Sequence, residues 1–409
     1  MADQHNSQDG GSVSTTPLSL ESLQAFAQAH NEFAVALYRQ LPLPPGNLFF
    51  SPFSIWTALG MVFAGARGET ASEMKQVLRF PFSDETLHGT FAKLLQDLVP
   101  GSESQCEMAV ANSLWSQKGM PLVVKFEEVM ARYYDRGLHL VDFQQQAEKA
   151  RGEINRWVED KTRRKIKELI PQGEVNTDTR LVLVNAVFFK GQWELPFPEH
   201  RTWDQPFYLD GQHEIEVPLM FQQEEIRYLH ADGFQAVDLA YKESDLSMLI
   251  LLPKEKSGLR DLEAQLSANW LRDCVEKLQV CEVKLHLPRF KFTWGTVNLQ
   301  DPLTNLDMRL AFTRFKADFS GINGYDPPDE NSLFIAGAFH QACVEVKEEG
   351  TEAGAATAVS TMLVGGIDFE EELRIPVFRA DHPFVFAIRD RKLGVILFLG
   401  RVTDPTKAN

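Results

Sequence analysis

The residue types that build reactive centres and metal sites do not fall at the required spacings in this chain. No two of its ten histidines are four residues apart, which is the spacing that places two zinc ligands on one helix face. The sequence contains no C-x-x-C pair and no G-x-S-x-G, H-E-x-x-H or G-x-x-x-x-G-K-S/T motif. We therefore expect no metal, no cofactor and no enzymatic activity. A Ser-His-Asp triad stays open, because its members can be distant in sequence.

The segment from Glu348 to Thr361, EEGTEAGAATAVST, consists mostly of small residues and carries no charge after Glu352. A strand presents alternate side chains to the two faces of its sheet. One set here is small or β-branched enough to be buried: Thr351, Ala353, Ala355, Thr357 and Val359. The other set can face outward: Glu352, Gly354, Ala356, Ala358 and Ser360. The composition alone suits a flexible linker, but the alternation and the strand-like flanks favour a strand.

Helices are expected mainly in the first half of the chain. Apolar residues recur every three or four positions between Leu20 and Leu37, which predicts a helix. The prolines of residues 41–47 cannot continue its hydrogen-bond ladder. A small apolar run at 55–63 and an amphipathic stretch at 151–169 predict two more helices.

Strands are expected mainly in the second half. Residues 181–189, LVLVNAVFF, are almost wholly apolar and β-rich, which predicts a central strand buried on both faces with Asn185 in its middle. A buried asparagine needs hydrogen-bond partners. Further strands are expected at 247–252, 283–287 and 395–399. Helices followed by strands indicate the α+β class.

The chain is expected to form one domain, residues 20–409, after a polar and disordered leader, residues 1–19. No internal repeat and no linker divides it. The leader lacks a charged start followed by an apolar stretch, so no signal peptide is visible, and no window is apolar enough to span a membrane. Four scattered cysteines, with no glycosylation sequon, favour the cytoplasm: Cys106, Cys274, Cys281 and Cys343.

The net charge of −16 argues against nucleic acid as a partner, because phosphate binding needs a basic face. The densest basic run lies within residues 161–167, and acidic residues flank it. We interpret this run as the solvated face of a helix.

Five stretches, in order, resemble the serpin family between Leu23 and Pro405. They are NLFFSPFSIWTALGMVFAGARGET from Asn47, LVNAVFFKGQWELPF from Leu183, EVKEEGTEAGAATA from Glu345, FRADHPFVFAIRD from Phe378 and ILFLGRVTDP from Ile396. The resemblance implies a serpin fold with three β-sheets, surrounding helices and an exposed reactive-centre loop.

The resemblance also implies a suicide inhibitor of serine proteases with a metastable native fold. The protease cleaves the loop and becomes acyl-linked, and the loop then inserts as a strand and traps it in a covalent complex. An elastase- or chymotrypsin-like target is expected, with a monomeric inhibitor. The alternatives are a non-inhibitory carrier or chaperone with this fold, and a cross-class inhibitor of cysteine proteases.

Site residues follow from the resemblance position by position. The shutter, a polar cluster where the strands of the main sheet part, matches Ser51, Ser54, Asn185 and His340. The breach, where insertion starts, matches Trp193, Arg289 and Glu348. The hinge matches Glu348, Gly350, Thr351, Glu352, Ala353, Gly354, Ala355, Ala356 and Thr357.

The family places the reactive bond at a fixed distance after the hinge glutamate. Counting Glu348 as the first residue, the seventeenth is Val364, so the expected bond is Val364–Gly365. Met362 and Leu363 are the alternatives, and the long acidic stretch 368–372 leaves a later bond open. Small or larger apolar side chains here suit elastase- or chymotrypsin-like pockets.

Overall fold

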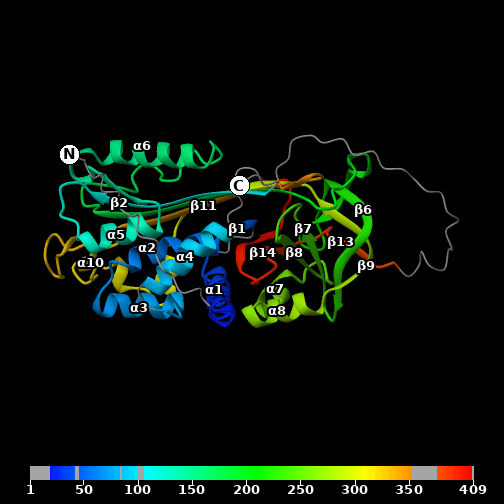
Figure 1. Cartoon of the computed structure of the whole chain (residues 1–409). Coiled ribbons are helices and arrows are strands. Elements are labelled where there is room, and N and C mark those ends of the chain that lie inside the picture. The colour runs from blue at the N-terminus through cyan, green and yellow to red at the C-terminus, as the bar shows by residue number, and fades with distance from the viewer. Residues whose placement is uncertain (1–18, 42–45, 83–84, 99–105, 352–374, 408–409) are drawn as a thin grey trace, which may run out of the picture.

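The structure is a computed structural model that describes residues 19–41, 46–82, 85–98, 106–351 and 375–407. Most of the predicted leader, the hinge from Glu352 onward and the expected bond Val364–Gly365 lie outside the described residues. The described part folds around two hydrogen-bonded sheets, with helices packed against both (Figure 1).

The first sheet has six strands in the order β10-β11-β12-β4-β2-β3. Their bounds are β10 Phe290–Asn298, β11 Gly337–Lys347, β12 Gly350–Thr351, β4 Leu181–Gln192, β2 Cys106–Gln117 and β3 Leu138–Val141. Strand β4 contains the predicted strand at 181–189, and its first nine residues are all buried. Helices cover both faces of the sheet, so this apolar run is buried on both sides as a central strand.

Strands β11 and β4 are direct parallel neighbours over most of their length. Their pairing runs from Gly337 opposite Val182 to Cys343 opposite Phe188. Beyond that point β12 lies between them, where Thr351 pairs with Gly191 on one side and with Val346 on the other. The sheet is therefore closed along β11 and β4 and parted at one end by the two residues of β12.

The second sheet has nine strands, with β1-β15-β14-β8-β7-β6-β9-β13 in order and β5 paired with β6. Their bounds are β1 Leu48–Phe50, β5 Trp203–Tyr208, β6 Glu214–Ala231, β7 Phe234–Ala240, β8 Leu246–Pro253, β9 Gln279–Pro288, β13 Val377–Arg379, β14 Phe384–Asp390 and β15 Ile396–Val402. Three sheets were expected. The described strands join into two because the 18-residue β6 pairs with β5 at one end and β7 at the other.

Helices flank both sheets: α1 Leu20–Tyr38, α2 Pro52–Phe63, α3 Gly68–Leu78, α4 Glu85–Leu98, α5 Val124–Tyr133, α6 Phe143–Lys161, α7 Leu259–Gln265, α8 Ala268–Lys277, α9 Gln300–Asn305 and α10 Ser320–Asn323, with short 3-10 helices at Glu199–Arg201 and Leu310–Phe312. Figure 1 shows α6 over one face of the six-stranded sheet, and α2, α4 and α5 on the other face. The main core includes Trp56, which is fully buried and packs 4.5 Å from Phe26 between ring centroids.

The predicted helix at 151–169 differs from α6, which begins earlier and ends at Lys161. The Thr162 hydroxyl donates to Val158 O at 2.8 Å, and Arg163 and Arg164 then adopt positive φ angles of 52° and 63°. The left-handed conformation ends a right-handed helix. The basic run is therefore mostly a loop beyond the helix, not a solvated helix face.

Candidate functional site

A buried polar cluster lies where α2 meets β4 and β11. Ser51 caps α2 by accepting the Ser54 N–H, and its own hydroxyl donates to Leu397 O at 2.7 Å. Asn185 on β4 donates to the Ser54 hydroxyl at 2.5 Å, and its carbonyl contacts the His340 ring on β11. The four residues expected for the shutter therefore share one hydrogen-bonded network.

The hydrogen bonds fix the protonation of His340. Its Nε2 lies 3.3 Å from the Ser51 backbone N and must accept that hydrogen bond, so the proton of the neutral ring is on Nδ1. The Nδ1–H group donates to the Asn185 carbonyl. Burial lowers the pKa of His340 to about 3. The ring is therefore neutral at physiological pH.

A further member of this cluster, Asn112, was missed from the sequence. It lies on β2 opposite Asn185, donates to Ser54 O at 3.2 Å and accepts from both the Ser54 hydroxyl and the Asn185 amide. The signal was a second asparagine inside a strand-like stretch, Cys106–Gln117. The polar network thus spans β2, β4 and β11.

An ion pair lies at the end of the sheet that β12 parts. The guanidinium of Arg289 donates through Nε to Glu348 at 2.7 and 2.8 Å, and the Thr202 hydroxyl donates to the same carboxylate at 2.5 Å. Burial alone would raise the pKa of Glu348, but the bonds from Arg289 and Thr202 outweigh it and hold the pKa below its ordinary value. Only 4% of Glu348 is exposed, whereas 41% of the Arg289 side chain is exposed, so a largely buried carboxylate is paired with a partly exposed guanidinium.

Trp193 and Tyr241 close the same end of the sheet. The Trp193 indole donates to Lys347 O at 3.0 Å and stacks on the Tyr241 ring at 4.7 Å between centroids. The hydroxyls of Tyr241 and Thr351 are 2.9 Å apart. The segments that carry Trp193 and Glu348, both expected for the breach, are hydrogen-bonded through the backbone, because Trp193 N donates to Glu349 O and Phe197 N donates to Glu348 O.

Thr351 corrects one expectation from the sequence. It was predicted to become buried when the hinge inserts, but it is already fully buried between β11 and β4. The parted end of the six-stranded sheet has room for Thr351, because its side chain is short and β-branched and its hydroxyl contacts that of Tyr241.

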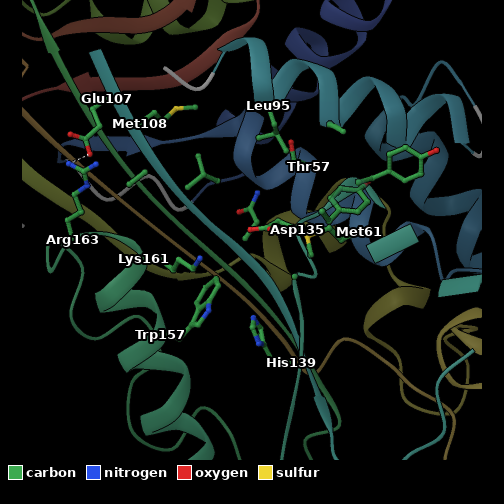
Figure 2. A pocket seen from close by; sticks show the side chains of 17 residues that line it. Thr57, Met61, Leu95, Glu107, Met108, Asp135, His139, Trp157, Lys161 and Arg163 are labelled. Carbon is green, nitrogen blue, oxygen red and sulfur yellow. Dashed lines mark ion pairs between the residues drawn. The ribbon is translucent and has the colours of Figure 1, made fainter. Parts of the chain in front are cut away.

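Helix α6 and the loop after it are tied to the outer face of the same sheet. Arg163 forms an ion pair with Glu107 on β2 at 2.5 Å, and the Lys165 ammonium lies 5.5 Å from the centroid of Phe188 on β4. Figure 2 shows the Arg163–Glu107 pair at one end of a pocket of about 590 Å³ that follows β2. Trp157 of α6 and His139 of β3 lie further along it, with ring centroids 5.2 Å apart.

Within the described residues, no group of three or more histidine, cysteine or acidic side chains is placed to hold a metal ion. The four cysteines form no disulfide. Burial raises the pKa of Cys106 and of Cys274 to about 11, so both stay protonated thiols at neutral pH. No helix in the described ranges is long and apolar enough to cross a membrane.

Comparison with known proteins assigns the family. The family model described as "Serpin (serine protease inhibitor)" matches residues 28–405. The leukocyte elastase inhibitor of Equus caballus is 39% identical over 94% of this chain and all of its own length, and serpin B3 of Homo sapiens is 35% identical over the same shares. The solved structure of human thyroxine-binding globulin, complexed with thyroine, matches with a TM-score of 0.81 and 30% identity, over 94% of this chain and all of that one. The chain belongs to the serpin family.

Proposed function

We propose that this chain is a suicide inhibitor of serine proteases, consumed in the reaction and not a turnover enzyme. The observation that carries the proposal is the join between β11 and β4. They are parallel neighbours whose separation has begun at one end, where β12 already occupies two positions. A segment continuing from β12 has a path between them, and each of its peptide groups would find partners on both sides.

The residues after Thr351 suit that path. The alternation in the sequence continues with Ala353, Ala355 and Thr357 in the inward set. Small side chains can enter a packed interior, whereas large or charged ones would be expensive to bury. Thr351 is the first residue of the inward set, and its burial against Tyr241 supports this assignment of inward and outward positions.

The two polar clusters are proposed to control this movement. Inserting a strand roughly doubles the ~4.8 Å spacing of β11 and β4, so the contact between His340 and Asn185 must break. Glu348 and Arg289 would fix the point at which the loop enters. We therefore assign the shutter role to the first pair and the breach role to the second pair together with Trp193.

The proposed target is an elastase- or chymotrypsin-like protease, with cleavage at Val364–Gly365. Relatives named leukocyte elastase inhibitor support this class. Val364 is small and apolar, and the nearest following basic residue is Arg374, ten positions on. Trypsin-like cleavage at Arg374 would leave a longer tether and less compression of the trapped protease. We further propose a monomer that acts in the cytoplasm.

Incubation with an elastase-like, a chymotrypsin-like and a trypsin-like protease tests the proposal. An SDS-stable complex whose released fragment begins at Gly365, or one or two residues earlier, is the expected result. Cleavage without a complex would indicate a substrate or a carrier with this fold, and a cysteine protease added to the panel tests the cross-class alternative. Trapping only after cleavage at Arg374 would contradict the assigned bond.

A further inference from the structure

The chain re-enters the described structure at β13, a short strand on the edge of the nine-stranded sheet. Strand β13 has three residues and pairs in parallel with β9. Two flanking main-chain bonds accompany this pairing: Lys284 N donates to Pro376 O at 2.9 Å, and Ala380 N donates to His286 O at 3.0 Å. So short an edge strand depends on side-chain contacts to stay in place.

Arg379, the last residue of β13, supplies those contacts. Its Nη2 donates to Gln205 Oε1 on β5 at 2.6 Å, and its Nε donates to Asp381 Oδ2 at 3.1 Å. Its Nη1 lies 3.4 Å from Nδ1 of His286, its register partner on β9. The guanidinium fork therefore joins β13 to two other strands and to the turn that follows.

The contact between Arg379 and His286 depends on the charge of the imidazole. A guanidinium has donors only, so the neutral ring must accept at Nδ1. A protonated ring would present an N–H and a positive charge to the guanidinium instead. Burial chiefly, with Arg379 as a second cause, lowers the pKa of His286 to about 4, while Asp381 opposes the shift.

We propose that Arg379 is the positioning residue that keeps β13, the first strand after the reactive-centre loop, on the edge of its sheet, and that His286 makes this contact sensitive to pH. Strand β12, which precedes the loop, belongs to the other sheet, so the two strands that flank the loop are held by separate contacts. The inference goes beyond inhibition and is tested without any protease, so its failure and that of the proposed function are distinguishable.

The other groups around the His286 ring do not reverse the direction of its pKa shift. Phe221 on β6 covers the ring, with 4.7 Å between the two ring centroids. The Arg201 guanidinium lies 5.8 Å from the centroid of the Phe221 ring. Arg379 disfavours a charged imidazole. The Asp381 carboxylate favours the charged imidazole, but it is also held by Arg379 and contacts the His382 ring, and the net pKa of His286 stays lowered.

Asp381 also contacts His382, whose two ring nitrogens face acceptors. Nδ1 lies 2.8 Å from Asp381 Oδ1, and Nε2 lies 2.7 Å from Pro253 O. Asp381 therefore contacts the His382 ring through one oxygen and Arg379 through the other.

The expected size follows from proton linkage. Release of β13 would raise the pKa of His286 from about 4 toward its ordinary value of 6.5. The released state therefore binds a proton first as the pH falls, so the stabilisation of β13 is fully present above pH 6.5 and is lost as the pH falls toward 4. Between pH 7.5 and pH 5 the equilibrium constant for release should rise by at most about 30-fold, the value for a complete return to 6.5.

Hydrogen–deuterium exchange of the full chain measures this release. The reporters are the amides of Lys284 and Ala380, which bond across β13, with rates corrected for intrinsic pH dependence. Amides of β8 serve as the internal reference for the whole fold. We expect a rise of up to about 30-fold at the reporters and a much smaller change in β8. A parallel rise in β8, or no rise at the reporters, overturns the proposal.

His286→Asn is the decisive variant, because its side-chain oxygen can accept from Arg379 but cannot be protonated. Its reporters should exchange with little dependence on pH. His213→Asn is the matched control, since His213 is exposed on the turn before β6 and should leave the wild-type pH profile unchanged. Arg379→Gln should raise reporter exchange at both pH values with β8 still protected. Wild-type pH profiles in His286→Asn, or unchanged exchange in Arg379→Gln, would overturn the assignment.

Discussion

The side chains of His340 and Asn185 are hydrogen-bonded across β11 and β4, at positions paired in the parallel register of the two strands. The bond exists only while these strands are neighbours, because one intervening strand would separate them by about 10 Å. We therefore expect it to stabilise the uncut state specifically, and a variant can test that selectivity.

His340→Ala should destabilise the uncut protein more than the loop-cleaved protein. The change leaves the Asn185 carbonyl and the Ser51 N–H buried without their partner, at a cost of about 1–3 kcal/mol for each such group. Unfolding in denaturant, before and after loop cleavage, gives the two free energies. His30→Ala is the control, because His30 is also fully buried but bonds to Ile396 O on β15. Equal losses in both forms of His340→Ala would contradict the shutter role.

Cleavage within the loop should raise the thermal stability of the whole protein. Cutting a chain ordinarily adds disorder, but here a freed segment after Thr351 would add a strand between β11 and β4 and complete its backbone hydrogen bonds. Thermal unfolding before and after limited proteolysis, with the cut site sequenced, is the measurement. An unchanged or lower midpoint in the cut form would speak against insertion.

Most of the site residues were predicted through the resemblance to the serpin family, and Asn185 was also predicted from its own chemistry. Asn185 interrupts an apolar strand, so it had to be part of a polar cluster. Asn112 was not found, because its strand, Cys106–Gln117, mixes buried and half-buried residues without a clear period. Its importance comes from its position opposite Asn185, which is a matter of register and not of local pattern.

Two further features required the tertiary structure. The amphipathic pattern continues past Lys161, but α6 ends there. The Thr162 hydroxyl donates to the last turn, and the next two residues, Arg163 and Arg164, adopt the left-handed backbone conformation. Local periodicity does not reveal such a helix end. The burial of Thr351 could not be predicted either. It depends on how far β11 and β4 part in the uncut state, a balance between distant strands.

The predicted register can be tested at the next positions of the loop. Thr357→Arg should convert the inhibitor into a substrate, because its inward side chain would place an unpaired charge in the sheet, at a cost of several kcal/mol. Insertion would slow, and the acyl link would hydrolyse before the protease was trapped. Ala356→Arg is the matched control, since that position belongs to the outward set. The stoichiometry of inhibition measures both, and equal trapping by the two variants would show that the register is wrong.

The Arg163–Glu107 pair should slow insertion by holding the loop after α6 against the sheet. The Arg163 side chain is 56% exposed and that of Glu107 17% exposed, so the pair contributes at most about 1 kcal/mol. Arg163→Ala should therefore accelerate insertion by up to about five-fold. A fluorophore on the loop, followed by stopped flow after protease addition, reports the rate.

Arg164→Ala is the control for that prediction, because it removes the same charge from the adjacent residue while leaving the Arg163–Glu107 pair intact. A general effect of net charge would accelerate both variants alike. Restraint by the pair predicts that only Arg163→Ala is faster, and that Glu107→Gln shares its effect because it breaks the same contact from β2. High salt should bring the wild-type rate toward that of Arg163→Ala, since a partly exposed ion pair is screened. A wild-type rate in both Arg163→Ala and Glu107→Gln would remove the pair from the mechanism.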